Sequence, residues 1–230
     1  MSTPTIAPRL RARMPRLPVP HVTAHEGEAM SYDLAAVPEP GATEGVRLAF
    51  TDPIEQDWMW GVLWHRQGLD RGGDPIFDMV NTPRQRRCMR LGLCQVCGRT
   101  ARDPESRRLW WVMARPAWFT EAGEPYVSSP PTCRSCIQGA RRLCPKLPHD
   151  APAYTAAAVQ PYGVLGNLYR AAGRGRVALK QEKVILPFDD FRRLEFTLAT
   201  QLLAVLEDLR PEELPPGDHD EGVLAGMAAH

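Results

Sequence analysis

Four of the six cysteines form two Cys-x-x-Cys pairs, Cys94 with Cys97 and Cys133 with Cys136, separated by 35 residues. A two-residue spacer lets both sulfurs of a pair reach one metal ion at roughly 2.3 Å, and four thiolates complete the tetrahedral shell that Zn²⁺ prefers. The spacing therefore predicts one structural zinc ion. Because sulfur would fill all four positions, no open position remains for a reactive water, and a hydrolytic role of this zinc is disfavoured.

Other cysteine chemistries compete with this prediction. Cys-x-x-Cys is also the unit of thiol–disulfide exchange, but a redox site needs one pair at a helix start in a βαβ setting. A zinc-dependent base deaminase needs proline directly before its Cys-x-x-Cys, and here Thr132 separates Pro131 from Cys133. Cys88 and Cys144 are close enough in sequence to replace a ligand, although we place both outside the site as small apolar residues.

The elements that must position the four cysteines can be predicted from turn residues and from alternation. Gly98 follows Cys97 and suits the tight turn of a zinc knuckle. Alternating residues at 109–113 and an extended piece at 125–128 predict a β-hairpin between the two pairs. Residues 133–143 have helical character, which puts the second pair in the first turn of a helix. This order, over residues 93–147, resembles treble-clef and zinc-ribbon modules, and the resemblance implies a zinc held between knuckle and helix.

A helix is predicted on the N-terminal side of the module. Asp52 and Pro53 suit the start of a helix over residues 52–67, which would carry three tryptophans, Trp58, Trp60 and Trp64. A short basic helix at 82–90 then leads into the first cysteine pair.

The C-terminal third predicts a second structural unit. Strands at 154–160, 164–169 and 176–186 suggest an antiparallel meander. Apolar residues at helical spacing predict a long amphipathic helix over 188–209, which would cover the meander or form a homodimer contact. The expected fold class is α+β: a four-cysteine module of knuckle, β-hairpin and helix, a flanking Trp-rich helix, and a C-terminal meander plus long helix.

Composition suggests four parts along the chain. They are a disordered or extended Pro/Arg-rich arm at 1–45, the Trp-rich helix and zinc module at 46–150, the meander and helix at 151–212, and a flexible tail at 213–230. Neither a signal peptide nor an apolar run of membrane-spanning length is visible, so we expect a cytoplasmic protein with no membrane partner. The 23 prolines and the preference for arginine over lysine are typical of a GC-rich, bacterial genome.

Charge is distributed very unevenly. Residues 81–147 hold twelve arginines and Lys146 against four carboxylates, a net charge of +9, although the whole chain carries only +1. Such a segment favours an anionic partner, with DNA or RNA first, or docking on acidic segments of the same or another chain. The candidate contact residues are Arg84, Arg86, Arg87, Arg90, Arg107, Arg108, Arg141 and Arg142.

The predicted function is a non-catalytic zinc protein that binds nucleic acid in a regulatory or accessory role. One alternative is a subunit for protein interaction or assembly. A second is an enzyme whose site lies outside the zinc module, near His65. A cavity that joins His65 to carboxylates favours the enzyme, whereas a convex arginine surface favours the nucleic-acid binder.

Overall fold

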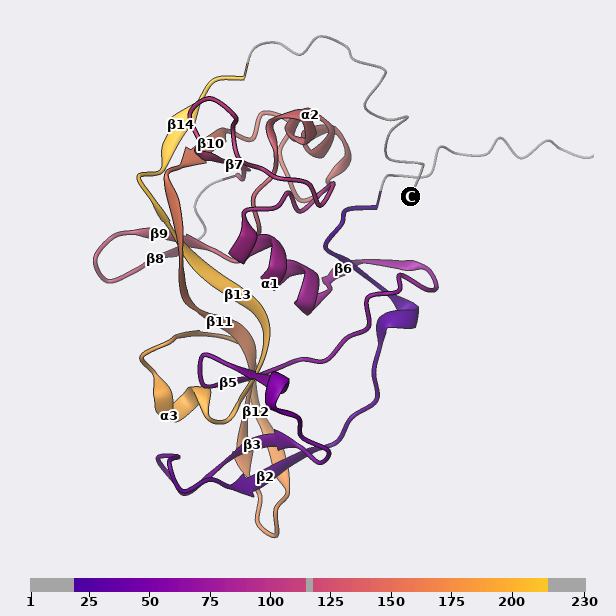
Figure 1. Cartoon of the computed structure of the whole chain (residues 1–230), viewed down its shortest axis with the longest axis vertical. Helices are drawn as coiled ribbons and strands as arrows, with labels where there is room; N and C mark the ends of the chain where they lie inside the picture. The colour runs from indigo at the N-terminus through magenta and orange to yellow at the C-terminus, as the bar shows by residue number, and fades with distance from the viewer. Residues whose placement is uncertain (1–18, 115–117, 215–230) are drawn as a thin grey trace, which may run out of the picture.

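Strand β13 (Thr197–Glu207) is the centre of the largest sheet in the computed structural model, which describes residues 19–114 and 118–214 (Figure 1). One edge of β13 pairs antiparallel with β11 (Ala158–Ala171), which pairs antiparallel with β12 (Val177–Pro187). The other edge pairs parallel with β5 (Val62–Trp64) and antiparallel with β9 (Pro125–Val127). Consecutive residues of β13 are buried, so this strand has core contacts on both faces.

The remaining described strands extend this sheet or form smaller ones. The antiparallel neighbours are β4 (Trp58–Met59) with β5, β8 (Trp118–Phe119) with β9, β10 (Ala153–Ala156) with both β7 (Leu109–Val112) and β14 (Arg210–Glu212), β1 (Thr23–His25) with β6 (Pro75–Val80), and β2 (Leu34–Pro38) with β3 (Val46–Phe50).

Helical structure is short throughout the described residues. The α-helices are α1 (Thr82–Leu91), α2 (Arg134–Leu143) and α3 (Phe191–Leu194), and the 3-10 turns are η1 (Glu26–Glu28) and η2 (Glu55–Asp57). None of these helices has the length and apolar character needed to cross a bilayer. The basic helix α1 begins after Asn81, whose side chain accepts a hydrogen bond from the Arg84 amide at 3.0 Å, and ends at Gly92 in the left-handed conformation.

A buried glutamine attaches α1 to the central sheet. The Gln85 amide donates to the Leu202 carbonyl at 2.9 Å and accepts from the Leu202 backbone N–H at 3.0 Å. Gln85 therefore makes, with a side chain, the two hydrogen bonds that a neighbouring strand would make to β13. Helix α1 delivers the chain to the first cysteine pair, so this contact fixes that pair relative to the core.

The predicted Trp-rich helix at 52–67 is wrong. The structure has the 3-10 turn η2 followed by the hairpin of β4 and β5, with Trp60 and Gly61 as the two-residue turn. The helix start predicted at Asp52 and Pro53 gives only one turn, which the Asp57 carboxylate closes by accepting a hydrogen bond from the Ile54 amide at 2.8 Å. Gly61 has φ +74°, which suits a tight hairpin turn, and the following Val, Leu and Trp favour a strand.

The predicted long helix at 188–209 is also wrong. Only the four residues of α3 are helical, and β13 occupies the rest of the segment. A strand buried on both faces carries a continuous apolar run, and such a run also satisfies helical periodicity. The strand forms because β11 and β5 offer backbone partners that the sequence pattern does not display. The predicted homodimer contact on this helix therefore loses its basis.

The hairpin predicted between the cysteine pairs forms differently. Strand β7 pairs with β10, and β9 pairs with β8 and β13, so 109–113 and 125–128 are not partners of each other. Together these corrections replace the expected α+β arrangement with a mostly β fold. Within the segment expected to be an arm, strands β1 and β2 are formed, whereas residues 1–18 lie outside the described part of the chain, as does the tail beyond residue 214.

Candidate metal centre

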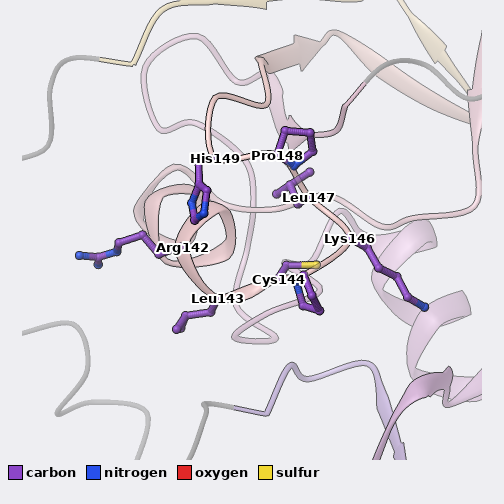
Figure 2. A pocket seen from close by; sticks show the side chains of 8 residues that line it. Arg142, Leu143, Cys144, Lys146, Leu147, Pro148 and His149 are labelled. Carbon is purple, nitrogen blue, oxygen red and sulfur yellow. The ribbon is translucent and has the colours of Figure 1, made fainter.

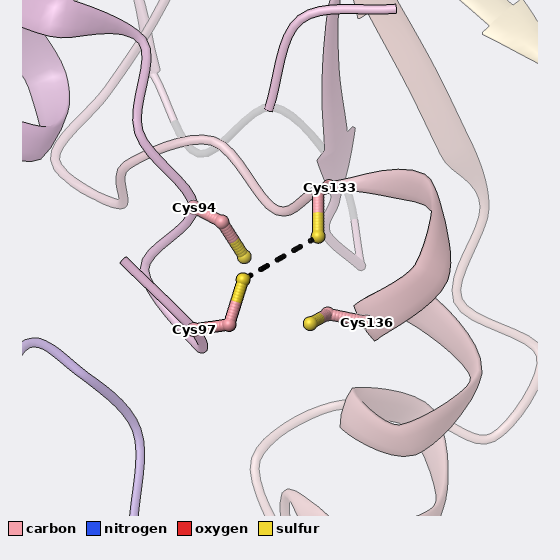
Figure 3. Close-up of side chains that lie close together, drawn as sticks. All are labelled: Cys94, Cys97, Cys133 and Cys136. Carbon is pink, nitrogen blue, oxygen red and sulfur yellow. Dashed lines mark hydrogen bonds between the residues drawn. The ribbon is translucent and has the colours of Figure 1, made fainter. Parts of the chain in front are cut away.

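The four cysteines of the two Cys-x-x-Cys pairs converge on one point. Their sulfur atoms all lie within 4.8 Å of one another, and the Cys97 and Cys133 sulfurs are 3.7 Å apart (Figure 3). A tetrahedron with Zn–S bonds of about 2.3 Å has edges of about 3.8 Å. All six cysteines of the chain are free thiols, so the cluster is no pair of disulfides. Four sulfurs at this spacing fit a tetrahedral divalent metal.

The first pair sits in a closed loop of the knuckle type. The Cys94 amide donates to the Arg99 carbonyl at 2.6 Å, and the Gly98 amide donates to the Cys94 carbonyl at 2.8 Å. The Val96 amide also points at the Cys94 sulfur, at 3.4 Å. Gly98 has φ +74°, and a Cβ at this position would lie 2.8 Å from Nδ1 of His21. Glycine is therefore required here both by the backbone and by the neighbour.

The second pair is placed by the start of α2. Cys133 is the N-cap residue, and the Cys136 amide donates to its carbonyl at 2.8 Å, so both sulfurs leave the first turn toward the knuckle (Figure 3). The Cys133 sulfur also contacts the Ser135 hydroxyl at 3.3 Å. Cys136 and Ile137 are buried, and Ile137 packs against Trp110 and Val112 of β7.

Hydrogen bonds join the two loops even without a metal. The Gln95 amide donates to the Pro131 carbonyl at 2.8 Å, and the Gln95 side chain donates to the Thr132 hydroxyl at 2.9 Å. The Thr132 amide in turn donates to the Trp110 carbonyl at 2.8 Å. These bonds hold the residues next to the ligands, so the four sulfurs are preorganised for one ion.

The sulfurs strongly affect each other's ionisation. Contacts among the four sulfurs lower the pKa of Cys97 and lower the pKa of Cys133 to about 6, and they raise the pKa values of Cys94 and Cys136. A lowered pKa favours the thiolate, the form that binds metal. The neighbouring Cys97 sulfur raises the pKa of the Arg99 guanidinium. A zinc ion with four thiolates carries a net charge of −2, which Arg99 partly offsets.

The two remaining cysteines lie outside the cluster, as predicted. Cys88 is fully buried in α1, and burial raises the pKa of its thiol to about 11. Cys144 is exposed just past α2, at a shallow cavity of about 500 Å³ that residues 142–149 line (Figure 2). None of the four clustered cysteines lines that cavity.

Three of the eight predicted contact arginines are engaged inside the molecule. Arg84 is buried and forms an ion pair with Glu28. Arg108 bonds the Asp208 carboxylate at 2.8 Å, and Arg141 donates to the Ala151 carbonyl at 2.8 Å. The exposed surface therefore has less positive charge than the sequence count suggests.

The other five arginines divide into one half-buried and four exposed side chains. Arg86 lies over the Trp64 ring, with 4.6 Å from its Cζ to the ring centroid. Arg87, Arg90, Arg107 and Arg142 are exposed, and none of them has a carboxylate within 4.0 Å in residues 19–114 and 118–214. Two further exposed arginines lie next to the ligands in sequence: Arg134 within the second Cys-x-x-Cys pair and Arg99 two residues after the first. This proximity was the available signal.

His65 does line a cavity with carboxylates. The cavity has a volume of about 400 Å³, and its lining includes His65, Asp52 and Asp57. Both carboxylates are paired with Arg66, at 2.9 Å and 2.6 Å. Burial lowers the pKa of His65. A carboxylate already bound to a guanidinium is a poor general base, so this arrangement does not form an acid–base pair.

No protein-family model matches the chain, and neither a curated protein nor a solved structure shows significant similarity to it. The sulfur cluster is thus compatible with a zinc module, while the treble-clef and zinc-ribbon resemblance gains no support from these comparisons. The functional argument rests on the site itself.

Proposed function

We propose that the four cysteines bind one structural Zn²⁺ and that the ordered module presents a basic surface to DNA or RNA. The chemistry of the donor set supports the first part, since four sulfurs match the softness and the geometry that zinc prefers. A fully occupied thiolate site supports folding and leaves no position for substrate, so the proposed role is non-catalytic.

The exposed face of α1 carries the second part of the proposal. Arg87 and Arg90 are three residues apart on this helix, project on neighbouring positions, and have no carboxylate partner in the described residues. Unpaired surface arginines suit phosphate oxygens, which a guanidinium can contact through two parallel hydrogen bonds.

An aromatic side chain adjoins this basic face. The Arg90 guanidinium lies 5.8 Å from the Trp60 ring centroid, and Trp60 is partly exposed at the tip of the β4–β5 hairpin. Trp60 has φ +54°, a conformation for which turns of this kind prefer asparagine, aspartate or glycine. The turn conformation therefore does not explain why a tryptophan occupies this position. Arginine beside an exposed ring is the combination that stacks and neutralises single-stranded nucleic acid.

Salt-dependent binding tests the proposal. We expect a fluorescein-labelled oligonucleotide to bind the zinc-loaded protein with an affinity that falls steeply with salt. The double variant Arg87→Gln, Arg90→Gln should reduce the slope of log K against log salt by about 2, because each lost phosphate contact removes about 0.9.

A matched control variant is available at the other end of the molecule. Arg170 and Arg176 are exposed at the β11–β12 hairpin, whose tip lies opposite α2 (Figure 1). The double variant Arg170→Gln, Arg176→Gln has the same net charge as the test variant and should keep the slope of the unmodified protein. Equal losses in both variants, or no binding at low salt, would reject the nucleic-acid proposal.

A further inference from the structure

The cavity of about 400 Å³ beside the β4–β5 hairpin has the size and wall of a small-ligand site. Its apolar wall is formed by Met30, Ile54, Trp64 and Pro83. The Trp64 ring is almost fully buried from solvent, and α1 contributes Pro83 from its first turn. A flat apolar group can therefore contact the exposed side chains of Met30 and Ile54, whereas the Trp64 ring lies behind the Arg86 guanidinium.

The two carboxylates at this cavity share one guanidinium. Arg66 holds the Asp57 carboxylate with two bonds, Nε to Oδ1 at 2.7 Å and Nη2 to Oδ2 at 2.6 Å, and reaches Asp52 at 2.9 Å. Asp57 is buried, which opposes its ionisation, yet the bonds from Arg66 lower its pKa overall. Two carboxylates and one guanidinium leave this group with a net charge of −1, and its surplus lies at Asp52, whose side chain is 75% exposed.

Arg86 lines the same cavity and is a cation with no counter-charge. Its Nη1 atom is buried without a hydrogen-bond partner, and in residues 19–114 and 118–214 no carboxylate lies within 4.0 Å of it. Burial and the neighbouring Arg90 lower the pKa of its guanidinium. An unpaired buried charge is costly in folded proteins and is normally compensated by a partner. The Trp64 ring covers the face of the Arg86 guanidinium, so only the edge of this group is left for such a partner.

We propose that this cavity binds a small organic anion, a carboxylate or a phosphate monoester with a flat apolar body, whose charged group pairs with Arg86. This proposal does not rest on nucleic-acid binding. The apolar body would lie along Met30 and Ile54, which are exposed, while His65 and Gln67 offer hydrogen-bonding groups at the cavity wall. Partial burial lowers the pKa of His65, which favours the neutral imidazole, a hydrogen-bonding group rather than a charge.

Four simple probes separate charge from shape. Benzoate and phenyl phosphate carry both ring and charge, benzamide has the ring alone, and acetate has the charge alone. We expect millimolar benzoate or phenyl phosphate, at constant ionic strength, to raise the thermal midpoint of the zinc-loaded protein by about 2–4 °C. Benzamide and acetate should produce little shift, because each satisfies only one half of the site.

Neighbouring arginines of α1 supply the test variant and its control. Arg86→Gln should abolish the stabilisation by benzoate and phenyl phosphate, whereas Arg87→Gln, which removes an exposed arginine one position along, should retain it. If Arg86→Gln folds poorly, Arg86→Met replaces it, because a long apolar side chain keeps the contact with Trp64. Stabilisation that survives in the folded Arg86 variant overturns the proposal.

The probes also distinguish a free ligand from a nucleic-acid phosphate. Equal shifts with benzoate and benzamide, or no shift with any of the four probes, overturn the proposal. A shift that requires a short single-stranded oligonucleotide and is absent with benzoate and phenyl phosphate also overturns it, since Arg86 then belongs to the nucleic-acid surface. Loss of oligonucleotide binding alone, with the probe shifts intact, rejects only the function proposed above.

Discussion

The cysteine module and the sheet around β13 are held together by different means. Beneath α2, the described hydrophobic cluster has five buried members, whereas the main cluster has 26 and includes Cys94, Cys133 and Cys136 beside the residues of β13. So small a cluster does little to offset the chain entropy of the segment around α2. In the function proposed above, four sulfurs around one ion supply further free energy to the module, while the sheet obtains its stability from side-chain packing. The two regions should therefore respond differently to metal removal and to core truncation.

Metal removal is the largest expected effect. Binding of a structural zinc is worth roughly 10–16 kcal/mol in small modules, so a strong chelator should unfold the segments around both cysteine pairs. Hydrogen exchange measures this segment by segment: amides of 93–100 and 133–143 should lose protection, while those of β11 and β13 keep most of theirs. Cys94→Ser should reproduce the pattern. Exchange that rises equally in β13 would show that the two regions are one cooperative unit.

The same contrast explains which features could be predicted from sequence. Ligand spacing is a local property, so the pairs Cys94–Cys97 and Cys133–Cys136, the knuckle at Gly98 and the start of α2 follow from adjacent residues. The partner of β13 is not local. Leu198 pairs with Leu63, far away in the sequence, and no periodicity within 188–209 contains that information.

Arginine counts mislead for a related reason. Net charge over 81–147 does not distinguish Arg84, which is buried against Glu28, from Arg87, which is exposed. The two belong to one basic run in the sequence and are separated only by the direction in which α1 presents them. Charge counting therefore cannot tell which of the eight predicted contact arginines are exposed.

Loss of the buried Glu28 carboxylate should be the next largest effect. Glu28 joins the N-terminal segment to α1 through Arg84 and accepts from the Asn81 amide at 2.9 Å. Glu28→Gln leaves the Arg84 charge unpaired and should lower the free energy of unfolding by about 3–5 kcal/mol at pH 7. Urea denaturation of the zinc-loaded protein measures this loss. A loss of similar size in Arg192→Gln, which removes an exposed ion pair with Glu44, would contradict the assignment.

The pH dependence of the Glu28 effect has a defined sign. Burial raises the pKa of Glu28, but hydrogen bonds from Arg84, the His25 amide and Asn81 bring it below its ordinary value of 4.5. The contribution of this carboxylate is thus complete above pH 4.5 and disappears as pH falls through the lower pKa of the folded state. The difference between the unmodified protein and Glu28→Gln should shrink in acid, and a difference that grows there would be inconsistent with this cause.

Core truncation sharpens the comparison between packing and metal. Leu202 in β13 and Ile137 in α2 are both fully buried. Leu202→Ala should lower the free energy of unfolding by about 2–5 kcal/mol whether or not zinc is present. Ile137→Ala should instead weaken zinc affinity in a chelator competition, because folding of the module and metal binding are linked. Equal zinc affinity in Leu202→Ala and Ile137→Ala would show that metal binding is not linked more closely to packing beneath α2 than to packing of β13.

The smallest effect on folding is expected at the hairpin tip that borders both regions. In Trp60→Asn the new residue suits a left-handed turn before Gly61, while the ring contacts with Trp64 and Phe188, at 6.1 and 5.2 Å, are lost. These terms oppose each other, so the free energy of unfolding should change by no more than about 1 kcal/mol. If Trp60 is retained for base stacking, affinity for a single strand should nevertheless fall by about 1–3 kcal/mol, and affinity for a duplex should fall less. A parallel loss for both nucleic acids, or none, would assign Trp60 to packing and leave the arginines of α1 as the only carriers of the proposed contact.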